Sequence, residues 1–292
     1  MKKLLKEKAM KINLKTYCIS ALALTAVLSV LRTLCLFFSY DTSVGYFNRS
    51  FLSVFTAALF IIGALWCLSP LVAIPRGEIS TKLTPDSIPL KAVSAYSAVV
   101  VLLSGVLMAM TAGMSPIEKL GAISAIISTP FFIFAISTKE KLEIVRAFSS
   151  IILVVALVSV LASVYFELTI AMNSPHKILG SFALMSAMLF VLCETRIYLA
   201  RFDAQKATPR LHFALSLTSA TLGLPFVISA SVYRLESGQS DFVTGAAILG
   251  NIGYIGIISA ITVYAAARCF TFTRRSLDFD IEIAEDDGYE TI

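Results

Sequence analysis

The sequence predicts an all-α, polytopic membrane helix bundle with eight transmembrane helices and both termini in the cytoplasm. The composition is the first reason: 57% of the residues are hydrophobic, the mean hydropathy is +0.83 and only 15% of the residues are charged. Soluble domains carry about 25% charged residues. The second reason is that the apolar residues form eight stretches, each near the ~20 residues that a spanning helix needs. The third is the placement of Lys and Arg between these stretches.

Positive charge predicts the orientation of the spans. Nineteen of the 24 Lys and Arg residues lie in the N-terminal flank and in every second connection, and four lie in the other connections. Cytoplasmic loops retain Lys and Arg during insertion, so the richer set is predicted to be cytoplasmic. The net charge of +5 follows from this topology and from contact with anionic lipid, so no nucleic-acid partner is expected.

The spans follow one another through short connections. A basic cytoplasmic segment, residues 1–16, precedes the first span, residues 17–40, which is too long for the apolar part of a cleaved signal peptide. The other spans are predicted at residues 51–74, 92–113, 120–138, 148–166, 178–200, 211–233 and 243–267. Short connections make neighbouring spans antiparallel. Pro70, Pro130 and Pro225 lie inside spans and are expected to kink them.

Residues 17–267 form the predicted transmembrane domain, in which residues 17–138 and 148–267 can be aligned as two halves. Tyr40-Asp41 aligns with Phe166-Glu167 at an offset of about 126 residues. A four-plus-four parallel repeat is one interpretation, as in some transporters, and chance similarity between apolar helices is the other. Residues 268–292 are an acidic tail that is expected to be disordered, cytoplasmic and able to dock a protein partner.

Arg32 is the one Lys or Arg that lies deep inside a predicted span, away from the connections and flanks. It lies about 12 Å below the outer interface at Tyr40, since a helix rises about 1.5 Å per residue. An Arg deep in a bilayer costs about 2.5–3.5 kcal/mol, so it needs acceptors or water. One hypothesis is a substrate-binding group in a central cavity with Asn251, Tyr254 and Ser186. The other is a structural pin to backbone carbonyls or to Asn251.

Three acidic residues near the ends of spans each have a functional and a non-functional interpretation. Asp41 and Glu167 end outward-running helices, where the helix dipole disfavours negative charge, and they predict either an acidic outer vestibule or solvated loop residues. Glu194 lies in the inner half of the sixth span, two residues before Arg196. A surface ion pair is the preferred interpretation, and a proton relay is the alternative.

The sequence lacks the residue patterns of known metal sites and catalytic sites. The five cysteines have no metal-ligand spacing and are expected to be core residues. His176 and His212 lie near opposite faces of the membrane, so they cannot share a metal. No metalloprotease or P-loop motif occurs. We expect no catalytic residue, no metal and no cofactor, with a membrane-embedded enzyme that lacks a recognisable motif as the exception.

The last span contains glycines next to Asn251, among them Gly253 and Gly256. Small residues at this spacing predict close helix packing, and the alternative is an unwound cavity wall.

These features favour a small-solute or ion permease, or the membrane subunit of a transport system, in a bacterial plasma membrane. The alternative is a non-transporting scaffold or signalling component that binds proteins through its cytoplasmic loops and acidic tail. The lipid bilayer is the expected partner, and a homo-oligomer is left open. A polar, water-filled cavity that reaches Arg32 would favour the permease, and a dry, packed centre would favour the scaffold.

Overall fold

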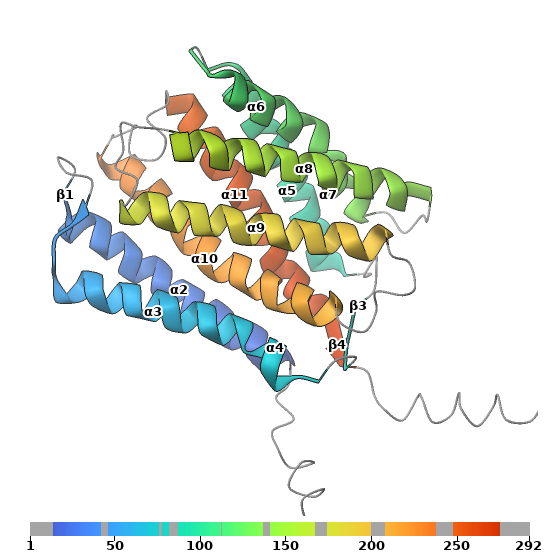
Figure 1. Ribbon diagram of the computed structural model, residues 1–292, viewed down its shortest axis with the longest axis horizontal. Helices are drawn as coiled ribbons and strands as arrows, with labels where there is room; N and C mark the ends of the chain where they lie inside the picture. Colours follow the sequence, from blue (N-terminus) through green and yellow to red (C-terminus); the bar gives the residue numbers. More distant parts are fainter. Residues whose placement is uncertain are drawn as a thin grey trace, which may run out of the picture.

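The computed structural model describes residues 14–41, 46–75, 78–81, 87–111, 113–136, 141–166, 174–199, 208–237 and 248–274. Eight helical spans in these ranges are long and apolar enough to cross a membrane, which confirms the predicted number. They run side by side as an antiparallel bundle (Figure 1). The fold therefore indicates an integral, multi-pass membrane protein. The orientation and the four-plus-four repeat stay predictions.

Six of these spans are single helices in the described ranges, and two are interrupted at proline. The single helices are α2 (Leu14–Phe38), α5 (Ile88–Ala109), α8 (Lys141–Phe166), α9 (Pro175–Leu199), α10 (Thr208–Ser237) and α11 (Ile248–Arg268). The second span is α3 (Phe51–Leu68) and then α4 (Pro70–Ala73). The fourth is α6 (Pro116–Ser128), α7 (Pro130–Ile133) and a 3-10 turn, Phe134–Ile136.

The interruptions follow from the chemistry of proline. Pro has no N–H and its ring crowds the preceding turn, so Pro70 and Pro130 each start a new segment instead of continuing the old one. Pro225, in contrast, lies inside α10, which continues as one helix around it.

Short strands lie at the two ends of the bundle. β1 (Tyr40–Asp41) pairs antiparallel with β2 (Tyr46–Phe47), in the connection between the first two spans. At the other end β3 (Ile79–Thr81) pairs antiparallel with β4 (Phe272–Arg274) (Figure 1). We name these the β1–β2 end and the β3–β4 end. By the distribution of Lys and Arg, the β3–β4 end is the one predicted to be cytoplasmic.

The second strand pair corrects the predicted start of the tail. Residues 268–274 were expected to belong to a disordered segment, but Arg268 ends α11, and Cys269–Thr271 form a 3-10 turn before β4. Phe272 is buried, and it packs in one hydrophobic cluster with Leu14 and Ile79. Burial of this aromatic ring and the pairing with β3 order the segment. The remainder of the predicted tail, residues 275–292, lies outside the described residues.

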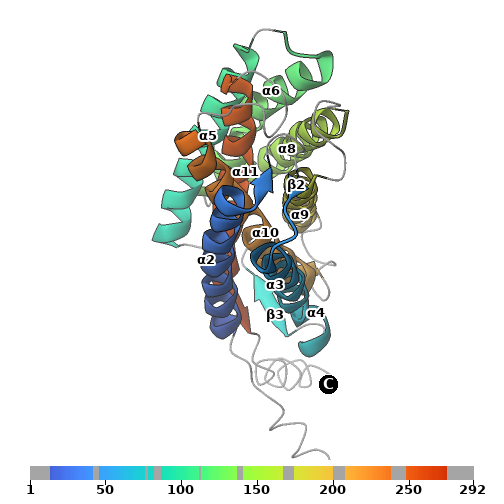
Figure 2. The ribbon, with the colours of Figure 1, turned by 90° about the vertical axis from the view of Figure 1, so that its left-hand side faces the viewer.

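The most central helix is α10. It packs against α2, α3, α9 and α11, and Figure 2 shows it surrounded by these neighbours. In the apolar part of α10 83% of the residues are buried, against 17% in the second span. The second span therefore lies at the edge of the bundle, with most of its surface available to lipid.

Close helix packing holds the α5–α11 side together. A Cβ atom at Gly256 would collide with Ser104 of α5, and one at Gly253 would collide with Met108. Small residues allow helices to approach in this way when lipid gives no hydrophobic driving force between them. The prediction of close packing is confirmed, and α11 is a continuous helix at these glycines rather than an unwound cavity wall.

Candidate functional site

Arg32 lies on the inner side of α2, toward the β1–β2 end, and is only 6% exposed. Its guanidinium carbon is 4.4 Å from the centroid of the Phe47 ring. Phe47 reaches this position because β2 folds back on β1, which places Phe47 opposite Tyr40. A guanidinium over an aromatic face gains an electrostatic attraction, of about 2 kcal/mol when the pair is desolvated. The ring thus stabilises one face of the cation.

The edge of the Arg32 guanidinium lacks acceptors. Its Nε and Nη2 atoms are buried and have no hydrogen-bond partner among the described residues. Nor do these residues include a carboxylate in an ion pair with it. Burial of an ionised group without a counter-charge is costly, and Arg stays protonated in proteins. Arg32 is therefore a fixed cation with free donors, which is the arrangement that an anionic ligand would complete.

Arg32 lines a cavity of about 600 Å³ between α2, α3, α9 and α10. We call this the Arg32 cavity. Its walls are mainly apolar, with Ile61 of α3, Phe182 of α9 and Leu222 of α10 as examples. The hydroxyl groups of Ser53 and Thr56 also line it, but they donate to backbone carbonyls of their own helix turn. Arg32 is consequently the one charged group among the described residues that line the cavity.

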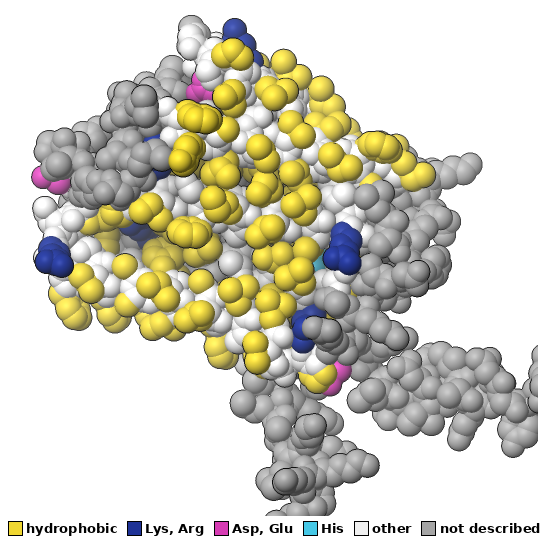
Figure 3. All heavy atoms as spheres, in the orientation of Figure 1, with side chains coloured by type: hydrophobic (Ala, Val, Ile, Leu, Met, Phe, Trp, Pro, Cys, Tyr) yellow, Lys and Arg dark blue, Asp and Glu magenta, His cyan; other side chains and the backbone are white. Residues whose placement is uncertain are grey.

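The cavity is at the side of the bundle, not in its centre. It is bounded by two helices from each predicted half of the chain, as a site between the halves requires. However, its α3 wall belongs to the least buried span, and the face that contains α3 and α9 is covered mainly by hydrophobic side chains (Figure 3). The expected polar, central cavity is therefore replaced by an apolar one at the edge.

Two of the residues that we expected beside Arg32, Tyr254 and Ser186, are not among the described residues that line the cavity. Tyr254 of α11 is buried against Phe226, with ring centroids 6.0 Å apart, and α10 lies between α11 and α2. The hydroxyl of Ser186 donates to the carbonyl of Ala183 in its own helix. The side chain of Asn251 lies outside the described residues. Depth along a span could be estimated from the sequence, but the direction in which each helix presents a residue could not.

The predicted outer vestibule is described only in part. Asp41 lies in β1, where it is half-buried and paired with Tyr46 of β2. Glu167 lies outside the described residues, so the acidic rim stays a prediction. Beside Asp41, burial raises the pKa of the Tyr40 hydroxyl, which therefore stays protonated at neutral pH.

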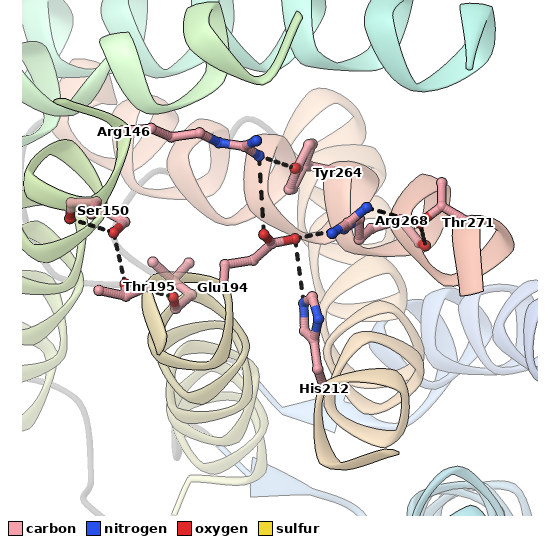
Figure 4. A network of polar contacts seen from close by, with 10 residues as sticks. Arg146, Ser150, Glu194, Thr195, His212, Tyr264, Arg268 and Thr271 are labelled. Carbon is pink, nitrogen blue, oxygen red and sulfur yellow. Dashed lines mark hydrogen bonds and ion pairs between the residues drawn. The ribbon is translucent and has the colours of Figure 1, made fainter. Parts of the chain in front are cut away.

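A second set of buried charges lies at the β3–β4 end, and its centre is Glu194 of α9. Both Glu194 and Arg268 are fully buried, and Nε of Arg268 donates to Oε1 of Glu194 at 2.8 Å. Nε2 of His212 lies 3.3 Å from the same oxygen, and Nη2 of Arg146 lies 4.0 Å from Oε2. Figure 4 shows that α8, α9, α10 and α11 each contribute a side chain to this Glu194 cluster.

Further contacts surround the Glu194 cluster. Arg146 donates from Nη2 to the Tyr264 hydroxyl at 2.6 Å, and Arg268 donates from Nη1 to Thr271 at 3.0 Å. The guanidinium of Arg146 lies 5.3 Å from the ring centroid of Phe131. Paired charges and hydrogen bonds between four helices fix the relative positions of those helices. The cluster is thus a structural tie between the spans.

The Glu194 cluster corrects two interpretations of the sequence. The surface ion pair with Arg196 is wrong, since Glu194 is buried while Arg196 is exposed. Arg146 and Arg268 were assigned to connections on the basis of their position at the ends of spans, but both are buried inside the bundle. The sequence does contain one signal: ionisable residues lie at the ends of several spans on the same side of the membrane. Their mutual contact depends on the packing of helices that are far apart in the chain.

Metal sites are not indicated by the described part of the chain. It contains no group of three or more His, Cys, Asp and Glu residues that could hold a metal ion. The five cysteines are free and buried, as expected for core residues. His176 packs on Phe226 toward the β1–β2 end, whereas His212 belongs to the Glu194 cluster.

Comparison of the chain with protein-family models, with curated proteins and with solved structures finds no match. A functional conclusion therefore rests on the geometry of the chain itself.

Proposed function

We propose that this multi-pass membrane protein binds a solute in the Arg32 cavity and moves it across the membrane, as a permease or as the membrane subunit of a transport system. The observation that carries the proposal is the buried Arg32, whose Nε and Nη2 donors have no partner among the described residues and which lines a cavity of about 600 Å³. Charged residues inside membrane spans often mark the path of a substrate. Pockets of several hundred Å³ are typical of small-molecule sites.

The position of the cavity suits transport. Its walls come from α2 and α3 on one side and from α9 and α10 on the other. Movement of one helix pair against the other would open or close it, as in transporters built from two halves. If the β3–β4 end is cytoplasmic, Arg32 lies in the outer half of the membrane and the Glu194 cluster closes the inner half.

The second candidate function is a non-transporting membrane scaffold. The packed centre of the bundle around α10, the close packing of α5 against α11 and the fully buried Glu194 cluster favour this alternative, because a packed centre is what the scaffold predicts and the other two features tie spans together rigidly. A scaffold needs no free cation within its spans, however, and the Arg32 cavity has no role in it.

A transport assay separates the two candidates. The full-length protein is reconstituted in liposomes, and the entry of radiolabelled acetate, entry of radiolabelled phosphate and transbilayer movement of a fluorescent phosphatidylglycerol are measured. We expect movement of at least one probe above that in empty liposomes, and a loss of about tenfold or more with Arg32→Gln. Exposed Arg196→Gln is the control, with expected activity close to that of the unmodified protein.

Failure of the folded protein to move any of the three probes would favour the scaffold. Equal rates for Arg32→Gln and the unmodified protein would remove the Arg32 cavity from the transport path.

A further inference from the structure

The Arg32 cavity is open toward the surface that faces lipid. Ile61 and Leu65 on its α3 wall are each 64% exposed, and Phe182 on its α9 wall is 57% exposed. In a chain that spans a membrane, such side chains contact the hydrocarbon of the bilayer rather than water. A molecule can therefore enter the cavity sideways, from the lipid phase.

The shape of the cavity fits an extended apolar chain. Its α3 wall runs from Ser53 to Leu65, which is about 18 Å along the helix axis at about 1.5 Å per residue. Along this wall lie Ala57, Ile61 and Ala64, and Ile178 and Phe182 of α9 face them. These side chains offer no hydrogen bonds to replace the hydration of a polar solute, so the long part of the ligand has to be apolar.

The Arg32 end of the cavity fits an anionic head. The guanidinium is buried, its Nε and Nη2 donors have no acceptor among the described residues, and Phe47 covers one of its faces. A phosphate can accept two parallel hydrogen bonds from the edge of a guanidinium. Phe47 belongs to the β1–β2 hairpin, beyond the ends of α2 and α3. The cation thus points toward the level at which lipid head groups lie.

We propose that the Arg32 cavity binds one anionic phospholipid, with its phosphate on Arg32 and one acyl chain between α3 and α9. This proposal rests on the proposed function, because it takes the Arg32 cavity as the binding site. It adds the class of ligand that the site binds. Charge complementarity selects the anionic lipid. A phosphatidylcholine would bring an ammonium group toward Arg32, and the described residues that line the cavity include no carboxylate for that group. In this interpretation Arg32 is buried without an acid among the described residues because the lipid supplies the anion.

The test is native mass spectrometry of the purified full-length protein, exposed in detergent to an equimolar mixture of phosphatidylglycerol and phosphatidylcholine. We expect one retained lipid and a preference for phosphatidylglycerol of about tenfold or more, because both lipids carry a phosphate but only phosphatidylcholine brings a positive charge near Arg32. Arg32→Gln should abolish the preference.

Ala57→Trp should abolish retention while Arg32 stays in place. Ala57 lines the cavity, and Ala58 is its neighbour on α3, exposed but not part of the lining. Ala58→Trp is therefore the matched control and should retain the lipid. Ala57→Trp also keeps the test decisive if Arg32→Gln fails to fold.

Three results would overturn the proposal: equal retention of both lipids, unchanged preference in Arg32→Gln, or displacement of the lipid by inorganic phosphate alone. The last result would show a site for a small polar anion and would leave the proposed transport function intact. Retention of phosphatidylglycerol by a protein that moves none of the three transport probes would uphold the lipid site and reject transport.

Discussion

Both ends of the bundle bury arginine, but among the described residues only one end buries an acid with it. At the β3–β4 end Arg268 donates to Glu194 at 2.8 Å, and Arg146 approaches the same carboxylate at 4.0 Å. Toward the β1–β2 end Arg32 has the Phe47 ring on one face and no carboxylate in an ion pair among the described residues. The first arrangement has its counter-charge within the chain, while the second has none among the described residues.

The comparison separates two uses of a buried charge. Taking a charge out of water costs several kcal/mol, and a counter-charge with good geometry offsets that cost. The Glu194 cluster meets this condition, and its side chains are as inaccessible as the core around them. Arg32 does not meet it, and it lines a cavity that a molecule can enter. We therefore assign a structural role to the Glu194 cluster and a binding role to Arg32.

The largest expected effect is that of Glu194→Gln. The substitution keeps the size of the side chain but leaves Arg268 and Arg146 without their counter-charge, so the free energy of unfolding should fall by about 3–5 kcal/mol. Thermal unfolding in detergent measures the change. Arg196→Gln on the exposed side of the same helix is the control, with an expected change below about 0.5 kcal/mol. Equal effects of the two substitutions would refute the structural role of Glu194.

The next effect is the energetic coupling between Glu194 and Arg268. If their direct contact matters, the double variant Glu194→Gln, Arg268→Gln should be less destabilised than the two single changes added together, by about 1–3 kcal/mol. The same unfolding measurements on four proteins give the coupling. Simple additivity would mean that the two side chains stabilise the bundle independently.

Arg32→Gln should act in the opposite direction when no lipid is bound. It removes a buried cation that has no acid, so the unfolding free energy of the delipidated protein should stay unchanged or rise by as much as about 2 kcal/mol. Added phosphatidylglycerol should then stabilise the unmodified protein but not the variant, because a ligand stabilises only the state that binds it. A destabilisation as large as that of Glu194→Gln would make Arg32 a structural residue and remove the contrast between the two ends.

The sequence drew attention to Arg32 at one of these ends and missed the Glu194 cluster at the other. Each span could be predicted because hydrophobicity and length are local properties, and Arg32 was conspicuous because of its depth within one span. The Glu194 cluster was missed because its members lie on four helices, with Arg268 74 residues from Glu194. Their contact depends on the rotation of each helix about its axis. The β3–β4 pair was missed for a similar reason, since two three-residue strands from distant connections leave no clear pattern.

The smallest expected effect concerns the aromatic face over Arg32. Phe47→Leu keeps the cavity wall apolar but removes the ring that lies 4.4 Å from the guanidinium carbon. In the absence of lipid the unfolding free energy should fall by about 0.5–2 kcal/mol, the range of a cation–π contact. Phe51→Leu is the control, since Phe51 is 85% exposed. When Arg32→Gln is already present, Phe47→Leu should cost less, because the charge that the ring stabilises is gone. The same cost in both backgrounds would show that Phe47 contributes by packing alone, and that Arg32 depends on the lipid for all of its electrostatic stabilisation.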